Sequence, residues 1–290
     1  MSLKEIQVPS YCNYIACFLT LSCNLKCNFC INYFDHEHEF KKETIPGEKW
    51  IEGLNRLVCS DNLPITLQGG EPGLHPDFIW IINNIKKEIN IDILTNLSFD
   101  VDRFINCVEP LRLKRNAPYP SIRVSYHPPY MDIDNLIKKV IKLQKAGFSI
   151  GIFAILHPKF KDEVLLTQER CLSLGIDFRT KEFLGKFNGR LYGNYRYVGA
   201  VGNSRRKRCL CRTSEIIIDI KGNIFRCHHD LYNQFSPVGN LLDPNFVIKD
   251  NFKECDQFGG CNPCDIKLKT DRFQVFGHTS VEIKDIKEYL

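Results

Sequence analysis

Three cysteines lie close together near the N-terminus of the 290-residue chain. In "LTLSCNLKCNFCINY" (19–33), Cys23, Cys27 and Cys30 are spaced C-x3-C-x2-C. Three thiolates from one short loop can hold three corners of an iron–sulfur cubane and leave the fourth corner open. Structural zinc usually takes four ligands as two separated pairs, although His36 and His38 follow a few residues later. The spacing therefore favours an iron–sulfur cluster, with zinc as the alternative.

A second group of cysteines lies near the C-terminus. It consists of Cys209, Cys211, Cys227, Cys255, Cys261 and Cys264. The stretch "EIIIDIKGNIFRC" predicts a β-hairpin with Gly222 at its turn, which would return Cys227 to the end where Cys209 and Cys211 lie. A hairpin that carries two thiolates, together with two more from a C-x2-C loop, could hold a metal centre with four thiolate ligands. A zinc ribbon has much the same spacing, so the spacing alone does not separate zinc from iron–sulfur.

A glycine-rich motif, "QGGEPGLHPD", follows the second predicted strand. Its residues Gly69, Gly70, Glu71 and Pro72 combine close backbone approach with a carboxylate that can accept from an ammonium group. A plain glycine turn is the alternative interpretation.

Composition and charge limit the class of protein. The N-terminus "MSLKEIQVPSY" lacks a signal-peptide pattern, and no window is apolar enough for a membrane span, so we expect a cytoplasmic protein without a membrane partner. The 14 cysteines are then metal ligands or redox groups rather than disulfides. The net charge of +5 is modest. Its basic runs, "RLKRN" (112–116) and "SRRKR" (204–208), are typical of solvated loops, which makes nucleic acid an unlikely partner.

The elements that position these residues alternate between strand and helix. Strands are predicted at 14–21, 64–68, 91–96, 121–127, 149–157 and 176–183, and helices at 47–61, 76–89, 132–147 and 161–175. This α/β order implies a parallel sheet whose strand C-termini collect the chemistry. Residues 184–208, rich in glycine and tyrosine, indicate a connector or lid. We place a domain boundary near 200, giving domains at 1–200 and 201–290.

The C-x3-C-x2-C loop with Phe29 before its third cysteine, followed by the GGEP motif, resembles the radical S-adenosylmethionine (radical SAM) enzymes. The resemblance covers 14–183 and implies a partial (β/α)6 TIM-like barrel. It implies a 4Fe-4S cluster on Cys23, Cys27 and Cys30, and S-adenosylmethionine on the open iron beside the residues of the GGEP motif. Reductive cleavage would then give a 5'-deoxyadenosyl radical.

Further cofactor contacts are expected at the strand ends. By the same resemblance, Ser125 lies where the family often has a polar residue on the ribose, with His127 as a neighbour. Asn96 ends a strand at the same barrel mouth, and Arg179 could meet the cofactor carboxylate. Each could equally be an ordinary strand-end residue.

The C-terminal pattern C-x9-15-G-x4-C, with Gly239 and Asn240 and a later cysteine loop, resembles the SPASM and shorter twitch extensions of these enzymes. The twitch form implies one auxiliary 4Fe-4S cluster, held by Cys227, Cys261, Cys264 and either Cys209 or Cys211. Cys255 departs from the pattern. Such a cluster could take an electron from the substrate radical, which would make the net reaction an oxidation. His228 and His229 are either near this cluster or in a surface turn.

Hydrogen abstraction from a small molecule is the predicted activity, with a phosphorylated, sugar or nucleotide-type compound as substrate. The basic run at 205–208 could raise the potential of the auxiliary cluster or hold a phosphate group. Only 22 residues precede Cys23, which disfavours an N-terminal peptide-recognition domain. Peptide modification is the alternative, and an iron–sulfur electron carrier or regulator is the non-enzymatic one. We expect an external electron donor of the flavodoxin or ferredoxin type.

Overall fold

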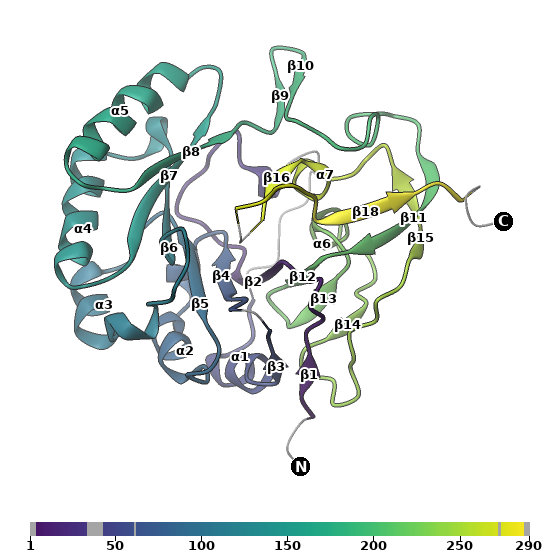
Figure 1. Ribbon diagram of the computed structural model, residues 1–290, viewed down its shortest axis with the longest axis horizontal. Coiled ribbons are helices and arrows are strands. Elements are labelled where there is room, and N and C mark those ends of the chain that lie inside the picture. The colour runs from purple at the N-terminus through teal and green to yellow at the C-terminus, as the bar shows by residue number, and fades with distance from the viewer. Residues whose placement is uncertain (1–3, 34–42, 61, 272–273, 287–290) are drawn as a thin grey trace.

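The fold is organised around one nine-stranded sheet, seen near the centre of Figure 1. The computed structural model describes residues 4–33, 43–60, 62–271 and 274–286. Strand order in the sheet is β14-β13-β12-β2-β4-β5-β6-β7-β8.

Six parallel strands form the barrel-like part of the sheet. They are β2 (Tyr14–Thr20), β4 (Ile65–Gly69), β5 (Ile91–Thr95), β6 (Ile122–Tyr126), β7 (Ile150–Leu156) and β8 (Phe178–Glu182). All neighbouring pairs among them are parallel. Each strand lies where the alternating apolar pattern predicts one, which confirms the predicted α/β fold.

Helices cover one side of this sheet, and Figure 1 shows them along its outer flank. They are α1 (Gly47–Leu54), α2 (Phe78–Asn84), α3 (Val101–Cys107), α4 (Ile133–Lys145) and α5 (Lys161–Ser173). In α4, Leu136, Val140 and Leu143 are buried, and the Asp132 side chain caps the first turn. Only α3 lacks a counterpart among the predicted helices.

The sheet continues into the C-terminal region. Strand β12 (Glu215–Ile218) pairs in parallel with β2, matching Glu215 with Tyr14 and Ile218 with Cys17. Strand β13 (Asn223–Phe225) returns antiparallel and pairs with β14 (Gly239–Asn240). The predicted hairpin is therefore present, and Gly222 has the positive φ of 76° that its turn requires. Residues on both sides of position 200 thus share one sheet.

The remaining C-terminal elements pack beside β12 and β13. A three-stranded sheet contains β11 (Lys207–Thr213) between β15 (Lys253–Phe258) and β18 (Val281–Lys284), and two short helices are α6 (His228–Tyr232) and α7 (Pro263–Ile266). The segment predicted as a connector contains a hairpin, β9 (Gly185–Phe187) and β10 (Arg190–Tyr192). The segment predicted as a connector or lid therefore includes a local two-stranded hairpin.

Short elements complete the chain. They are β1 (Ile6–Gln7), β3 (Leu57–Val58), β16 (Lys269–Thr270), β17 (Phe276–His278) and 3-10 turns at Ile31–Tyr33, Pro72–Leu74, Pro110–Arg112 and Pro128–Tyr130. Within the described ranges, no helix has the length and apolar character needed to cross a membrane.

Candidate iron–sulfur and cofactor site

The first cysteine loop begins directly after β2. Cys23, Cys27 and Cys30 are all half-buried, and the Leu25 N–H donates to Cys23 Sγ at 3.4 Å. Burial, together with the neighbouring Cys30 and Cys23, raises the pKa of Cys27 to about 12. Crowded thiols of this kind become thiolates when a cationic group binds them, so the donor set fits an iron–sulfur cluster. The alternative zinc ligands His36 and His38 lie outside the described residues.

The GGEP loop is bonded directly to the start of the cysteine loop. The Gly70 N–H donates to Thr20 O and the Glu71 N–H to Ser22 O, both at 2.8 Å. A Cβ on Gly70 would lie 2.2 Å from Ser22 O, so only glycine allows this approach. The two motifs identified in the sequence therefore form one contiguous backbone structure.

Glu71 is enclosed by the protein. Its side chain is 0% exposed, and its carboxylate accepts from Gly73 N (3.0 Å), Thr95 Oγ1 (2.6 Å) and Asn96 N (2.6 Å). Burial raises the pKa of Glu71, and these hydrogen bonds oppose that rise. In this arrangement the carboxylate fixes the GGEP loop to the end of β5, a role that the sequence interpretation did not assign.

Asn96 joins the same arrangement from the end of β5. Its Nδ2 lies 3.8 Å from Cys23 Sγ and donates to Asn24 Oδ1 at 2.8 Å. The structure thus brings Asn96, Glu71 and Cys23 together, as their positions in sequence led us to expect. A contact between Asn96 and the cofactor stays a prediction.

Ser125 lies half-buried on the face of β6 that points away from the helices. Alternate residues Ile122, Val124 and Tyr126 belong to the helix-packed core, which places Ser125 and Arg123 on the opposite, inner face. His127 follows the strand, and burial lowers its pKa to about 4.

An aromatic cluster surrounds Phe29, the residue before the third cysteine. Phe29, the residue before Cys30, lies 5.7 Å from the His127 ring and 5.2 Å from the His157 ring, centroid to centroid. His157 is buried and directly follows β7, as His127 follows β6. The sequence analysis missed His157, although a polar residue after a buried strand was the available signal.

Arg179 lies apart from these groups. Its guanidinium donates to the Asp177 carboxylate at 2.9 Å and to Pro118 O at 2.8 Å. Asp177 precedes β8 and Pro118 precedes β6, so this guanidinium is held at the amino ends of the strands, whereas the cysteine loop follows a carboxyl end.

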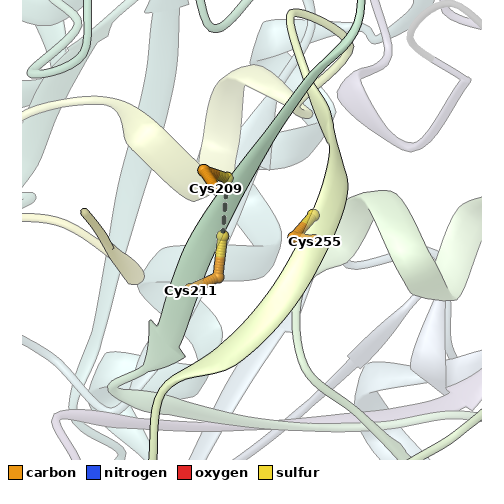
Figure 2. A group of neighbouring side chains, drawn as sticks. All are labelled: Cys209, Cys211 and Cys255. Carbon is orange, nitrogen blue, oxygen red and sulfur yellow. Dashed lines mark hydrogen bonds between the residues drawn. The ribbon is translucent and has the colours of Figure 1, made fainter. Parts of the chain in front are cut away.

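The second cysteine group is concentrated on neighbouring strands. Cys209 and Cys211 share one face of β11, and Cys255 lies opposite Cys209 on β15. Figure 2 shows the three side chains directed toward one another, with 3.5 Å between the sulfurs of Cys209 and Cys211. All three sulfurs lie within 4.8 Å of one another, the tightest metal-ligand grouping in the described part of the chain. Cys255, which the sequence pattern left out, is thus part of this group.

The other three cysteines lie on adjoining turns. Cys227 lies between β13 and α6 and caps α6, with its Sγ accepting from Asp230 N at 3.4 Å. It shares a small apolar cluster with Cys261. Burial raises the pKa values of Cys227, Cys261 and Cys264. Hydrogen bonds from Cys209 and Cys211 instead lower the pKa of Cys255, which makes its thiolate the easiest to form. The structure therefore brings Cys209, Cys211 and Cys255 into one close group, whereas Cys227, Cys261 and Cys264 lie outside that group. The four-thiolate site of Cys227, Cys261, Cys264 and either Cys209 or Cys211 stays a prediction.

A Cys255→Ala substitution tests whether this sixth thiol is a ligand. We expect it to lower the metal content of the C-terminal site, since its sulfur lies against both Cys209 and Cys211. Iron and zinc would be measured together by elemental analysis of protein reconstituted anaerobically. Cys107→Ala, at the exposed end of α3, is the matched control. Unchanged metal content in both variants would remove Cys255 from the ligand set.

Comparisons with known proteins agree with this site. No family model matches the chain. Over 183 residues it is 26% identical to the GTP 3',8-cyclase of Aquifex aeolicus, covering 57% of this chain and 55% of the cyclase. Over 80 residues it is 31% identical to an S-adenosylmethionine-dependent nucleotide dehydratase of Selenomonas ruminantium, covering 27% of each protein. The chain thus spans about half, or less, of the curated relatives it matches.

Solved structures share the fold. Streptococcus suis SuiB, bound to its precursor peptide SuiA, superimposes with a TM-score of 0.56 over 81% of this chain and 64% of SuiB, at 15% identity. The enzyme anSMEcpe with bound AdoMet gives a TM-score of 0.54 over 82% of this chain and 78% of its own, at 13% identity. The chain is thus similar in sequence to a GTP 3',8-cyclase and to an S-adenosylmethionine-dependent nucleotide dehydratase, and it shares the fold of SuiB and anSMEcpe.

Proposed function

We propose that the chain is a radical SAM enzyme with a SPASM/twitch-type C-terminal region, and that it abstracts hydrogen from a small anionic substrate after reductive cleavage of S-adenosylmethionine. The single observation that carries the proposal is the bonding of the GGEP loop, through Gly70 and Glu71, to the loop of Cys23, Cys27 and Cys30. With cluster and cofactor bound, the chemistry supplied there would be a 5'-deoxyadenosyl radical. Cys23, Cys27 and Cys30 would hold the cluster, and the GGEP loop, Asn96 and Ser125 would orient the cofactor.

The inner face of the sheet supports an anionic substrate. Lys181 lies on this face of β8, with Nζ 5.1 Å from the Phe153 ring centroid on β7. Its side chain is accessible to water, yet the surrounding protein and the cations Arg123, Lys267 and Lys269 lower its pKa to about 7. Arg123 pairs with Asp92 and Lys269 with Glu215, whereas no carboxylate of the described residues pairs with Lys181. A bound anion would offset the repulsion between Lys181 and the neighbouring cations. This favours phosphorylated, sugar phosphate or nucleotide-type substrates.

A Lys181 amine with a pKa near 7 should react as a neutral nucleophile at ordinary pH. At pH 7.5 we expect trace acetic anhydride to acetylate Lys181 about a hundredfold faster than an ordinary surface lysine, because far more of it is unprotonated. The rate should rise with pH through about 7 and then level off. Peptide mass spectrometry would measure it against the exposed Lys186. Equal labelling of the two lysines would refute the lowered pKa of Lys181.

Peptide modification is the second candidate function. The solved structure of SuiB with the precursor peptide SuiA supports it, because that protein shares this fold. The curated relatives named for GTP and for nucleotides, and the cationic inner face, support the small-molecule substrate instead. An external donor of the flavodoxin or ferredoxin type would supply the electron, and net oxidation would use the second cysteine group.

Anaerobic reconstitution with iron and sulfide, followed by dithionite and S-adenosylmethionine, tests the proposed function. We expect 5'-deoxyadenosine and methionine in the product mixture, measured by liquid chromatography and mass spectrometry. Protein with a full N-terminal cluster that forms no 5'-deoxyadenosine would instead favour an electron carrier or regulator.

A further inference from the structure

A polar cavity of about 130 Å³ lies beside α6, outside the barrel face that carries Lys181. Its polar lining comes from three segments of the C-terminal region: Arg206 from the basic run, the side chains of His229, Tyr232 and Asn233 from α6 and its end, and Gln257 and Asn262 from the cysteine-rich loop. No aspartate or glutamate of the described residues lines it. The cavity has room for a tetrahedral oxyanion, and Arg206 brings a positive charge to its lining. Outside the lining, the Asp265 carboxylate accepts from the His229 backbone N–H at 3.0 Å.

His229 lines this cavity, and its ring carries a buried nitrogen without a hydrogen-bond partner among the described residues. Asn233 Nδ2 lies 3.3 Å from His229 Nδ1. An amide nitrogen only donates, so Nδ1 accepts and the ring proton of the neutral form lies on Nε2. His229 Nε2 is buried and has no hydrogen-bond partner among the described residues. Buried donors are usually paired, so this N–H is available to an acceptor.

Arg206 supplies the positive charge. Its guanidinium lies flat over Gly260, where a Cβ would come within 2.5 Å of the central guanidinium carbon. One nitrogen donates to Asn203 O, and no carboxylate of the described residues pairs with it. By contrast, Arg208 of the same basic run pairs with Glu254 on the surface. Arg206 is therefore held by backbone contacts and keeps free donors of its planar fork for a ligand.

The cavity borders both cysteine groups. The Tyr232 hydroxyl donates at 2.6 Å to Asn32 Oδ1, two residues after Cys30, while Gly260 and Asn262 flank Cys261. We propose that this cavity is a binding site for a phosphate group, held by the Arg206 guanidinium and the His229 Nε2–H. The site deepens the proposed function, because it would bind the phosphate group of the substrate. Only this identification of the phosphate with a substrate rests on the proposed function.

Titration calorimetry with inorganic phosphate, on the full chain reconstituted anaerobically, tests the site. We expect Arg206→Ala and His229→Gln to weaken binding about tenfold each, since each removes one charge-assisted or buried hydrogen bond. Arg205→Ala is the matched control, because it removes the same charge from the adjacent exposed position that does not line the cavity. Arg206→Lys should restore part of the affinity, since it keeps the charge but loses the planar fork. Metal content and thermal unfolding would establish that each variant is folded.

The source of the phosphate is distinguished by two more ligands. Tighter binding of a nucleoside 5'-monophosphate than of inorganic phosphate, with no binding of the nucleoside, would assign the site to a substrate phosphate. Equal binding of the two phosphates would assign it to the free anion. Loss of affinity in Arg205→Ala equal to that in Arg206→Ala, or no binding to the wild-type chain, would overturn the proposal. Formation of 5'-deoxyadenosine is scored separately, so either hypothesis can fail alone.

Discussion

Alanine in place of Cys23, Cys27 and Cys30 should abolish 5'-deoxyadenosine formation while leaving metal in the C-terminal region. The three thiols are the proposed cluster ligands of the first loop, so this substitution would leave Asn96 and the GGEP loop beside a loop without a cluster. The second group lies on other elements: on β11 and β15, at the start of α6, and in and just before α7. We therefore expect about four irons per chain to remain if the second group holds one cubane.

Elemental analysis and electron paramagnetic resonance of the dithionite-reduced triple variant measure this outcome. Cys107→Ala again serves as the control, because it removes an exposed thiol outside both groups. Zinc with little iron would reject an auxiliary iron–sulfur cluster. The short separations among Cys209, Cys211 and Cys255, all within 4.8 Å, make this a real alternative, since tetrahedral zinc with Zn–S near 2.3 Å places its sulfurs about 3.8 Å apart.

Local patterns predicted the parallel sheet well because each strand carries its own signal. For example, the apolar run 64–68 became β4 at Ile65–Gly69, and the run 149–157 became β7 at Ile150–Leu156. Pairing over long sequence separation has no such signal. Nothing in "EIIID" indicates that Glu215 will lie beside Tyr14, so the extension of the sheet by β12 emerged only from the structure.

The candidate site was likewise predictable from the sequence only in part. Cysteine spacing identified both groups, but cross-strand register placed Cys255 opposite Cys209, and register is a tertiary property. Likewise the basic run 204–208 is uniform in sequence, and only its packing against Gly260 separates Arg206 from its neighbours. A charge run shows the composition of a segment, whereas the contacts of each side chain in the folded protein determine which charge faces a cavity.

A Glu71→Ala substitution is expected to destabilise the protein even without any cofactor. It would leave three donors, Gly73 N, Thr95 Oγ1 and Asn96 N, without their acceptor in a fully buried position. Each unsatisfied buried donor costs about 1–3 kcal/mol, so we expect a loss of about 3 kcal/mol or more in the free energy of unfolding. Urea unfolding under anaerobic conditions, without S-adenosylmethionine, would measure it.

Glu52→Ala is the matched control for this substitution. Glu52 forms an exposed pair with Lys49 on α1, so its loss should change the free energy of unfolding by no more than about 0.5 kcal/mol. If Glu71 served only to accept from a cofactor amine, both variants would unfold alike and only cofactor binding would weaken. A large loss of unfolding free energy in Glu71→Ala alone would instead show that the GGEP carboxylate has a structural role in the loop. The backbone donors that it accepts from hold Gly70 next to Ser22 and Asn96 next to Cys23.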